Sequence, residues 1–457
     1  MRLLLLFGMI FQSGAADFPP VKNFGNAADF GTGIQRAMTL MATSTPEKPN
    51  TVRVLFYGQS ITEQKWWREV ENYLKTSYPH ANLLIENRAI GGFSSQLLVK
   101  TAETDLYHFY PDLLIFHVYG SHIEYENIIK RVRERTTAEI LLQNDHCTDP
   151  SHLTEETDPG KLNPSSWNAW MNHSFLPSTA RKYGAELVDQ HNLWKDYLKT
   201  HDLSPSRLLS DSVHLNDHGC YLMAELVKPH LRYRPELPKE KWINSVRTIA
   251  VKPDQWKNEF VDLEVDGNRI DLILSPQATK DASIDIEIDG RKPSGFPGVF
   301  GFSRSTYYPG TIWPCLIGIS SEKQLEVEQW TVRLSEVSDD HKQFKFSLEG
   351  SKTGPDGDGL SSEKFVSKSG RIVIEPDDWH LARSFEHTKA PLPKEFVVRW
   401  DVIPYFKDRV DLAEINSRGE RTVTIAQGIE NKPHRLKLIT KTPGAIEAVR
   451  VYTPPLR

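Results

Sequence analysis

The sequence predicts an α/β domain, with a parallel sheet in a three-layer α/β/α arrangement, followed by an all-β domain. Three observations support this prediction. In the first half of the chain, short apolar runs alternate with segments of helical periodicity, the pattern of parallel strands covered by helices on both faces. Beyond residue 240 helical periodicity stops and short alternating runs between Gly, Pro and Asp turns replace it. A length of 457 residues also favours two domains over one.

The first domain is expected to span residues 51–235. A leader of residues 17–50 precedes it, and its short helical patch, Ile34 to Met41, is expected to pack against the domain. The expected strands are 52–57, 81–86, 113–118, 138–143 and 185–189, and the expected helices are 62–77, 123–135, 166–183 and 217–231.

The second domain, residues 240–457, is predicted to be a sandwich or jelly-roll. Its alternating runs are residues 284–288, 344–348, 396–400, 422–425 and 436–439. The stretch from Ser351 to Gly359 is expected to be a turn. A solvated turn is expected there, in preference to a calcium site formed by Asp356 and Asp358.

The N-terminal sequence indicates where the protein is located, and the net charge argues against a nucleic-acid partner. Residues 1–16 combine one basic residue, a short apolar run and small residues, the pattern of a secretory signal peptide. We therefore expect a secreted or periplasmic protein, and no later stretch is apolar enough to predict a membrane span. A net charge of −5 gives no basic surface for nucleic acid.

Ser60 is the first candidate for chemistry. It follows the apolar strand pattern through Gly58 and Gln59 and precedes a helix pattern, at the sheet edge where ligands collect in α/β proteins. Most such serines only cap a helix. Far downstream, however, Asp211 and His214 stand three residues apart, and together they offer the carboxylate and base that a nucleophilic serine requires.

Other polar residues are predicted to reach the same place. Gly92, His122 and Asn144, like Ser60, each follow a predicted strand. The carboxyl ends of parallel strands share one edge of the sheet, so we expect all four residues to gather there.

These blocks resemble those of the SGNH, or GDSL-like, hydrolases over residues 51–235. The resemblance implies that Ser60 is the nucleophile and His214 the base, with Asp211 orienting it. It also implies an oxyanion hole formed by the backbone N–H groups of Ser60 and Gly92. His122 stands where the family has an asparagine, so the third donor is either His122 or Asn144.

The resemblance predicts a secreted serine esterase that needs no cofactor. The stretch from Thr424 to Leu438 resembles the jelly-roll modules attached to carbohydrate esterases, so the expected substrate is an acylated, most simply acetylated, carbohydrate. Two alternatives are open: a hydrolase of lipid or aryl esters, and a non-catalytic carbohydrate-binding protein on the same scaffold.

Two further groups of residues bear on chemistry. The loop from Asn144 to His152 resembles a metal-ligand cluster, with Asp145, His146, Asp149 and His152, but it is expected to line the active site and not to hold a metal. For the three cysteines, Cys147, Cys220 and Cys315, a disulfide between the first two and three buried reduced thiols are both open.

Overall fold

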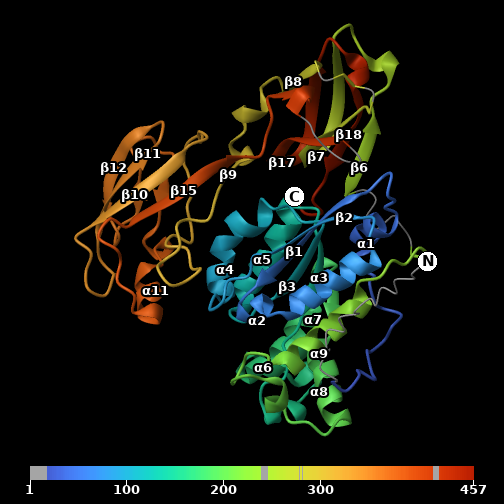
Figure 1. Ribbon diagram of the computed structural model, residues 1–457, viewed down its shortest axis with the longest axis vertical. Helices are drawn as coiled ribbons and strands as arrows, with labels where there is room; N and C mark the ends of the chain where they lie inside the picture. Colours follow the sequence, from blue (N-terminus) through green and yellow to red (C-terminus); the bar gives the residue numbers. More distant parts are fainter. Residues whose placement is uncertain (1–17, 238–244, 277, 280, 415–420) are drawn as a thin grey trace, which may run out of the picture.

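The computed structural model describes residues 18–237, 245–276, 278–279, 281–414 and 421–457. The predicted signal peptide therefore lies outside the described residues. Figure 1 shows an α/β part, coloured blue to green, with β-rich parts in yellow to red lying against one end of it. The predicted order of an α/β domain followed by antiparallel sheets is confirmed.

A five-stranded parallel sheet forms the centre of the α/β part, in the order β2-β1-β3-β4-β5. Successive residues of a strand point to opposite faces, and Val54 and Phe56 of β1 enter one apolar core while Leu55 and Tyr57 enter the other. The sheet is therefore buried on both sides, as predicted. The strands are β1 (Thr51–Gly58), β2 (Asn82–Asn87), β3 (Leu113–His117), β4 (Glu139–Gln143) and β5 (Glu186–Val188).

Helices cover both faces of this sheet (Figure 1). One core packs α1, α3, α8 and α9, and the other packs α4, α5 and α7. The helices are α1 (Gln35–Ala42), α2 (Ser60–Glu63), α3 (Trp66–Ser77), α4 (Ser95–Ala102), α5 (His122–Arg135), α6 (Trp167–Trp170), α7 (Leu176–Tyr183), α8 (Gln190–Thr200) and α9 (Asp217–Val227).

Some helices differ from the prediction. The expected helix 166–183 is divided, because a π-helical turn, Met171–Phe175, separates α6 from α7. Helices α4 and α8 were not predicted. α4 is only eight residues long, and α8 begins directly after β5 without a side-chain cap.

The C-terminal part contains two large antiparallel sheets, which Figure 1 shows as separate lobes. The first has the order β12-β11-β10-β15-β9, and the second β16-β8-β17-β7-β18-β6. The strands of the first are β9 (Phe300–Phe302), β10 (Gln329–Ser335), β11 (Lys345–Gly350), β12 (Gly354–Leu360) and β15 (Val397–Pro404). Those of the second are β6 (Val246–Ala250), β7 (Phe260–Leu274), β8 (Ser283–Ile288), β16 (Arg409–Asp411), β17 (Arg421–Ile439) and β18 (Ile446–Tyr452). This part also contains a small strand pair, β13 (Phe365–Val366) and β14 (Val373–Ile374), and helix α11 (Leu381–Thr388).

Two details of the β-rich part correct the prediction. The predicted turn 351–359 is largely strand β12, in which the absence of a side chain at Gly359 lets Phe346 and Phe365 pack closely: a Cβ there would lie 2.5 Å from the Phe346 ring. Asp356 is buried in this strand and accepts hydrogen bonds from Ser369, so it is not in a solvated turn. The runs 422–425 and 436–439 belong to one long strand, β17, which has irregular register between them.

Polar contacts join the α/β part to the β-rich part. The Arg304 guanidinium makes two hydrogen bonds to the buried Asp105 carboxylate, at 2.6 and 2.9 Å, and a third to the Arg88 carbonyl at 2.7 Å. Lys100 and Asp378 form an ion pair at 2.8 Å. These contacts lie beside the loop that follows β2, which carries Gly92.

Candidate active site

Ser60 occupies the turn between β1 and α2. Strand β1 ends at Gly58 and the helix begins at Ser60, so the hydroxyl lies at the carboxyl end of a central strand and at a helix N-terminus. The first N–H groups of a helix have no intrahelical acceptor, and the Ser60 N–H is one of these. This position therefore combines a hydroxyl with a backbone N–H for which the described residues offer no acceptor.

His214 and Asp211 lie next to Ser60. The Ser60 Oγ is 2.9 Å from His214 Nε2, and His214 Nδ1 is 2.7 Å from an Asp211 carboxylate oxygen. Nδ1 donates to the carboxylate, which leaves Nε2 with the lone pair that accepts the Ser60 hydroxyl proton. The three side chains are thus linked by two hydrogen bonds in series, the order in which a base accepts a serine proton and a carboxylate orients the base.

The Asp211 carboxylate is fixed by its own loop. Its second oxygen accepts hydrogen bonds from the backbone N–H groups of His214 and Val213, both at 2.7 Å. These two bonds, together with the bond from the His214 ring, lower the pKa of Asp211 to about 2. Asp211 is therefore ionised at neutral pH, although 54% of its side chain is exposed.

Neighbouring residues hold the loop that carries the base. Gln64, one helical turn after Ser60, accepts from the Leu215 N–H at 2.9 Å and donates to the Leu215 carbonyl at 2.7 Å. On the other side, His146 Nε2 donates to the Val213 carbonyl at 2.8 Å, while Tyr119 donates to His146 Nδ1. Burial lowers the pKa of His146 to about 3, so its ring is neutral and can make both bonds.

Gly92 lies on the loop that follows β2, and its backbone φ of 78° is in the left-handed region. A Cβ at this position would lie 2.7 Å from the Trp313 ring, so any other residue would be strained and would clash. Its neighbour Gly91 donates its N–H to the Glu63 carboxylate at 2.7 Å, whereas no acceptor for the Gly92 N–H is found among the described residues.

The two candidates for a third oxyanion donor have different surroundings. The His122 ring, at the start of α5, packs edge-on against Trp167, Trp170 and Phe175. The Asn144 side chain is fully buried, and its amide donates to the Asn172 carbonyl and to Asp189 while its oxygen accepts from the His191 N–H. Every polar atom of the Asn144 side chain is therefore engaged inside the protein.

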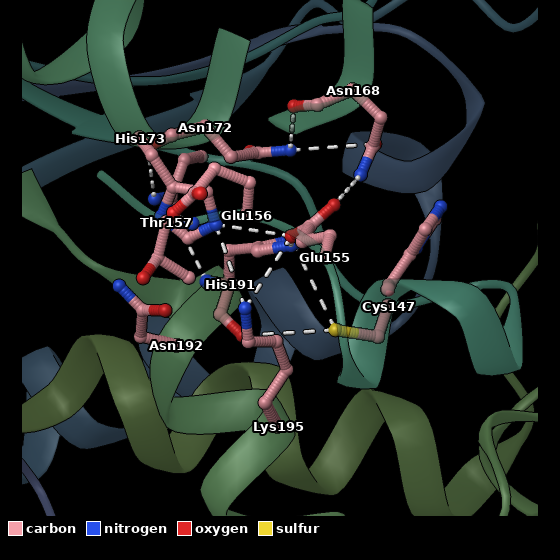
Figure 2. Close-up of polar contacts among 12 residues, drawn as sticks. Cys147, Glu155, Glu156, Thr157, Asn168, Asn172, His173, His191, Asn192 and Lys195 are labelled. Atoms are coloured by element: carbon pink, nitrogen blue, oxygen red, sulfur yellow. Dashed lines mark hydrogen bonds and ion pairs between the residues drawn. The ribbon is translucent and has the colours of Figure 1, made fainter. Parts of the chain in front are cut away.

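The loop after β4 does not gather the four residues that resembled a metal-ligand set. His146 binds the Val213 carbonyl, and Asp149 caps its own short helical turn by accepting from the Ser151 N–H. A different group assembles behind it instead: Glu155, His173, His191 and Lys195 (Figure 2). No local pattern in the sequence predicted this group, because its members lie on three separate segments.

This second cluster is a buried ion-pair network. Glu155, His173 and His191 place possible ligand atoms within 4.8 Å of one another. However, the Lys195 ammonium lies 3.4 Å from the same Glu155 oxygen that faces both rings, and 3.5 Å from His173 Nε2. Because lysine already supplies the positive charge at this carboxylate, we assign the cluster to structural pairing and not to metal binding.

The three cysteines are free and buried. The Cys147 sulfur lies 3.9 Å from the His191 ring, and Cys220 lies in α9, so the alternative of a disulfide between them is not what the structure shows. Burial raises the pKa of the Cys220 thiol to about 11, which leaves it protonated and unreactive.

Comparison with known proteins gave matches among solved structures only: no protein-family model and no curated protein matches the chain. The chain is similar to Axe2, an acetylxylan esterase from Geobacillus stearothermophilus, at 18% identity and a TM-score of 0.34, over 42% of this chain and 98% of that one. It is similar to LAE5, an alpha/beta hydrolase enzyme from the metagenome of Lake Arreo, Spain, at 16% identity and a TM-score of 0.32, over 39% and 94% of the two chains.

Within the described residues, no helix combines the length and apolar character needed to cross a membrane.

Proposed function

We propose that this protein is a serine ester hydrolase in which Ser60, His214 and Asp211 form the catalytic triad. The observation that carries the proposal is the continuous pair of hydrogen bonds from Ser60 Oγ to His214 Nε2 and from His214 Nδ1 to Asp211. Ser60 lies 154 positions before His214 in the chain, whereas Asp211 and His214 share one loop. This order of donors and acceptors is the one that activates a hydroxyl.

The proposed reaction has two halves. Ser60 Oγ attacks the ester carbonyl carbon while its proton passes to His214 Nε2, and Asp211 stabilises the imidazolium that results. His214 then gives this proton to the departing alkoxide, which leaves as the alcohol, and the acyl group remains on Ser60. A water molecule, deprotonated by His214, then attacks the acyl carbonyl carbon. The bond to Ser60 Oγ breaks, His214 returns the proton to Ser60, and the acid leaves.

The negative charge of the tetrahedral intermediate needs donors. We assign this role to the backbone N–H groups of Ser60 and Gly92, with His122 as the proposed third donor. The Ser60 N–H begins a helix and has no acceptor in the part of the chain that the structure describes, and Gly92 has a positive φ. Losing one such donor typically costs about 10²–10³-fold in rate.

The proposed substrate is an acylated carbohydrate, and the protein is proposed to meet it outside the cytoplasm. The support for this finer statement is the resemblance of the serine and histidine blocks to the SGNH hydrolases and of residues 424–438 to the jelly-roll modules attached to carbohydrate esterases. The signal-peptide pattern of residues 1–16 supports the location. No cofactor takes part in the proposed reaction.

Acetate release tests the function. Purified full-length protein should release acetate from acetylated xylan or acetylated sugars, and the Ser60→Ala variant should not. Faster cleavage of long-chain acyl or aryl esters than of acetylated glycans would replace the proposed substrate but keep the mechanism. Binding of glycans with no hydrolysis of any ester would contradict the proposed function.

A further inference from the structure

The β-rich part of the chain reaches the proposed oxyanion loop. The indole Nε1–H of Trp313 donates a hydrogen bond to the Gly91 carbonyl at 2.6 Å, and Arg383 donates to the Gly92 carbonyl at 3.3 Å. Both donors lie more than 200 residues beyond the loop that they contact.

The Trp313 bond bears directly on the Gly92 N–H. The Gly91 carbonyl and the Gly92 N–H belong to the same peptide unit, which is planar and trans, so the two bonds point in opposite directions. A hydrogen bond that fixes the Gly91 oxygen therefore also fixes the direction of the Gly92 N–H, the donor assigned to the oxyanion.

This peptide unit needs external support. Rotating it changes only ψ of Gly91 and φ of Gly92, and glycine occupies both signs of φ with little penalty. A donor between two glycines is thus the least constrained kind of backbone donor. On its other side, Gly91 is held through its N–H by the Glu63 carboxylate at 2.7 Å, but this bond belongs to the preceding peptide unit.

Trp313 is itself held firmly. Only 7% of the residue is exposed, and its ring packs against Phe93, His380 and His387, the last in a stacked arrangement with ring centroids 4.6 Å apart. Its backbone N–H and carbonyl are both hydrogen-bonded within the 308–313 turn, and its ring occupies the space beside Gly92 that a Cβ would need.

We propose that Trp313 is a positioning residue for the reaction: through the Gly91 carbonyl it holds the Gly92 N–H in the direction of the oxyanion. The proposal rests on the proposed ester-hydrolase function. It gives the β-rich part a role in catalysis, since the α/β part alone lacks the side chain that orients one of its donors.

The test removes the indole N–H with as little other change as possible. Two full-length variants serve: Trp313→Phe, and a protein carrying 3-benzothienylalanine at position 313, in which sulfur replaces the N–H and the ring size is kept. We expect kcat on a soluble acetyl ester to fall about 10- to 100-fold in both, below the full loss of a donor, with KM changed less than about twofold, because the bond acts in the transition state.

Matched controls separate positioning from general damage. Trp330→Phe makes the same substitution in the buried core of the β-rich part, where the indole N–H has no hydrogen-bond partner among the described residues, and should lower stability with kcat unchanged. Arg383→Ala removes the bond to the neighbouring peptide unit and should reduce kcat less than Trp313→Phe.

The outcomes are distinguishable from failure of the proposed function. Activity that survives Ser60→Ala would reject that function itself. If Ser60→Ala is inactive, but the protein with 3-benzothienylalanine is folded and retains the wild-type kcat, the triad stands and the role of Trp313 is wrong. A rise in KM alone would also overturn it, since that result marks substrate contact and not orientation of the donor.

Discussion

Two histidine–carboxylate pairs in the α/β part look alike as contacts and differ in what surrounds them. His214 lies 2.7 Å from Asp211, and His191 lies 2.5 Å from Glu155. The first pair is open to solvent, with 40% of His214 exposed, whereas the His191 side chain is 0% exposed. The other ring nitrogen of His214 faces the Ser60 hydroxyl, while that of His191 faces the Asp145 carbonyl.

The second nitrogen decides what each pair can do. A histidine whose remaining nitrogen meets a hydroxyl can accept its proton, and solvent access lets a substrate reach it. A histidine that donates to a carboxylate and to a backbone carbonyl has no lone pair left and must be protonated. The Glu155 pair therefore ties α8 to the segment that follows β4, whereas the Asp211 pair faces a hydroxyl.

The largest loss of activity is expected from substitutions of His214, in the solvent-exposed pair, and of Ser60, which it contacts. Ser60→Ala and His214→Ala should each reduce kcat/KM on a small acetyl ester by at least about 10³-fold, because the two side chains act as one unit. The double variant should be hardly worse than either single one. Additive losses in the double variant would show that the two residues act separately.

Asp211→Asn should separate activity from stability. An amide cannot stabilise the imidazolium and can hold the wrong tautomer, so we expect kcat to fall about 10²–10⁴-fold. Asp211 is exposed, so the urea unfolding midpoint should stay close to wild type. A large loss of stability with unchanged kcat would mean that the His214–Asp211 pair is structural, like the His191–Glu155 pair.

Glu155→Gln makes the corresponding change in the buried His191–Glu155 pair, and here we expect stability to fall while kcat is kept. Removing this charge leaves Lys195 and His191 without their carboxylate, and breaking a buried pair costs about 3–5 kcal/mol of unfolding free energy. The kcat of the folded fraction should remain close to wild type. The control is Glu156→Gln at the neighbouring position, whose exposed carboxylate pairs with Lys161 at the surface and whose loss should cost at most about 0.5 kcal/mol.

The pH dependence of stability gives the smallest signal. Burial would lower the pKa of His191, but its bonds to Cys147 and Glu155 raise it from 6.5 to about 10. A raised pKa in the folded state means that the stabilisation is complete below 6.5 and is lost as the pH rises through 10. Unfolding free energies of wild type and His191→Gln, measured by urea titration, should therefore converge as the pH rises over this window. A constant difference would show that His191 does not hold this proton.

Local and topological signals predicted part of the site. The rule for the edge of a parallel sheet placed Ser60, whereas Asp211 and His214, which share one short block, were assigned to it from residue type and the resemblance to the SGNH hydrolases. The same rule placed Asn144 near the edge but could not tell that its amide would be engaged by Asn172 and Asp189.

Contacts between distant segments could not be predicted in this way. Trp313 reaches Gly91 only because the β-rich part docks beside the loop after β2, and no spacing in the sequence encodes that docking. The contact of Gln64 with the loop that carries His214 was easier to anticipate, since Gln64 lies one helical turn after Ser60. Strand β12 was mistaken for a turn because its glycines and aspartates are typical of turns, whereas here Gly359 makes room for aromatic rings from the neighbouring segments.

The most direct test of the central claim is active-site labelling. Full-length protein should be treated with a fluorophosphonate, which reacts with activated serine hydroxyls, and the labelled peptide identified by mass spectrometry. We expect one adduct, on Ser60, forming in step with loss of esterase activity and forming far more slowly in His214→Ala. An adduct on another serine, or full esterase activity in protein labelled at Ser60, would contradict the assignment of Ser60 as the nucleophile.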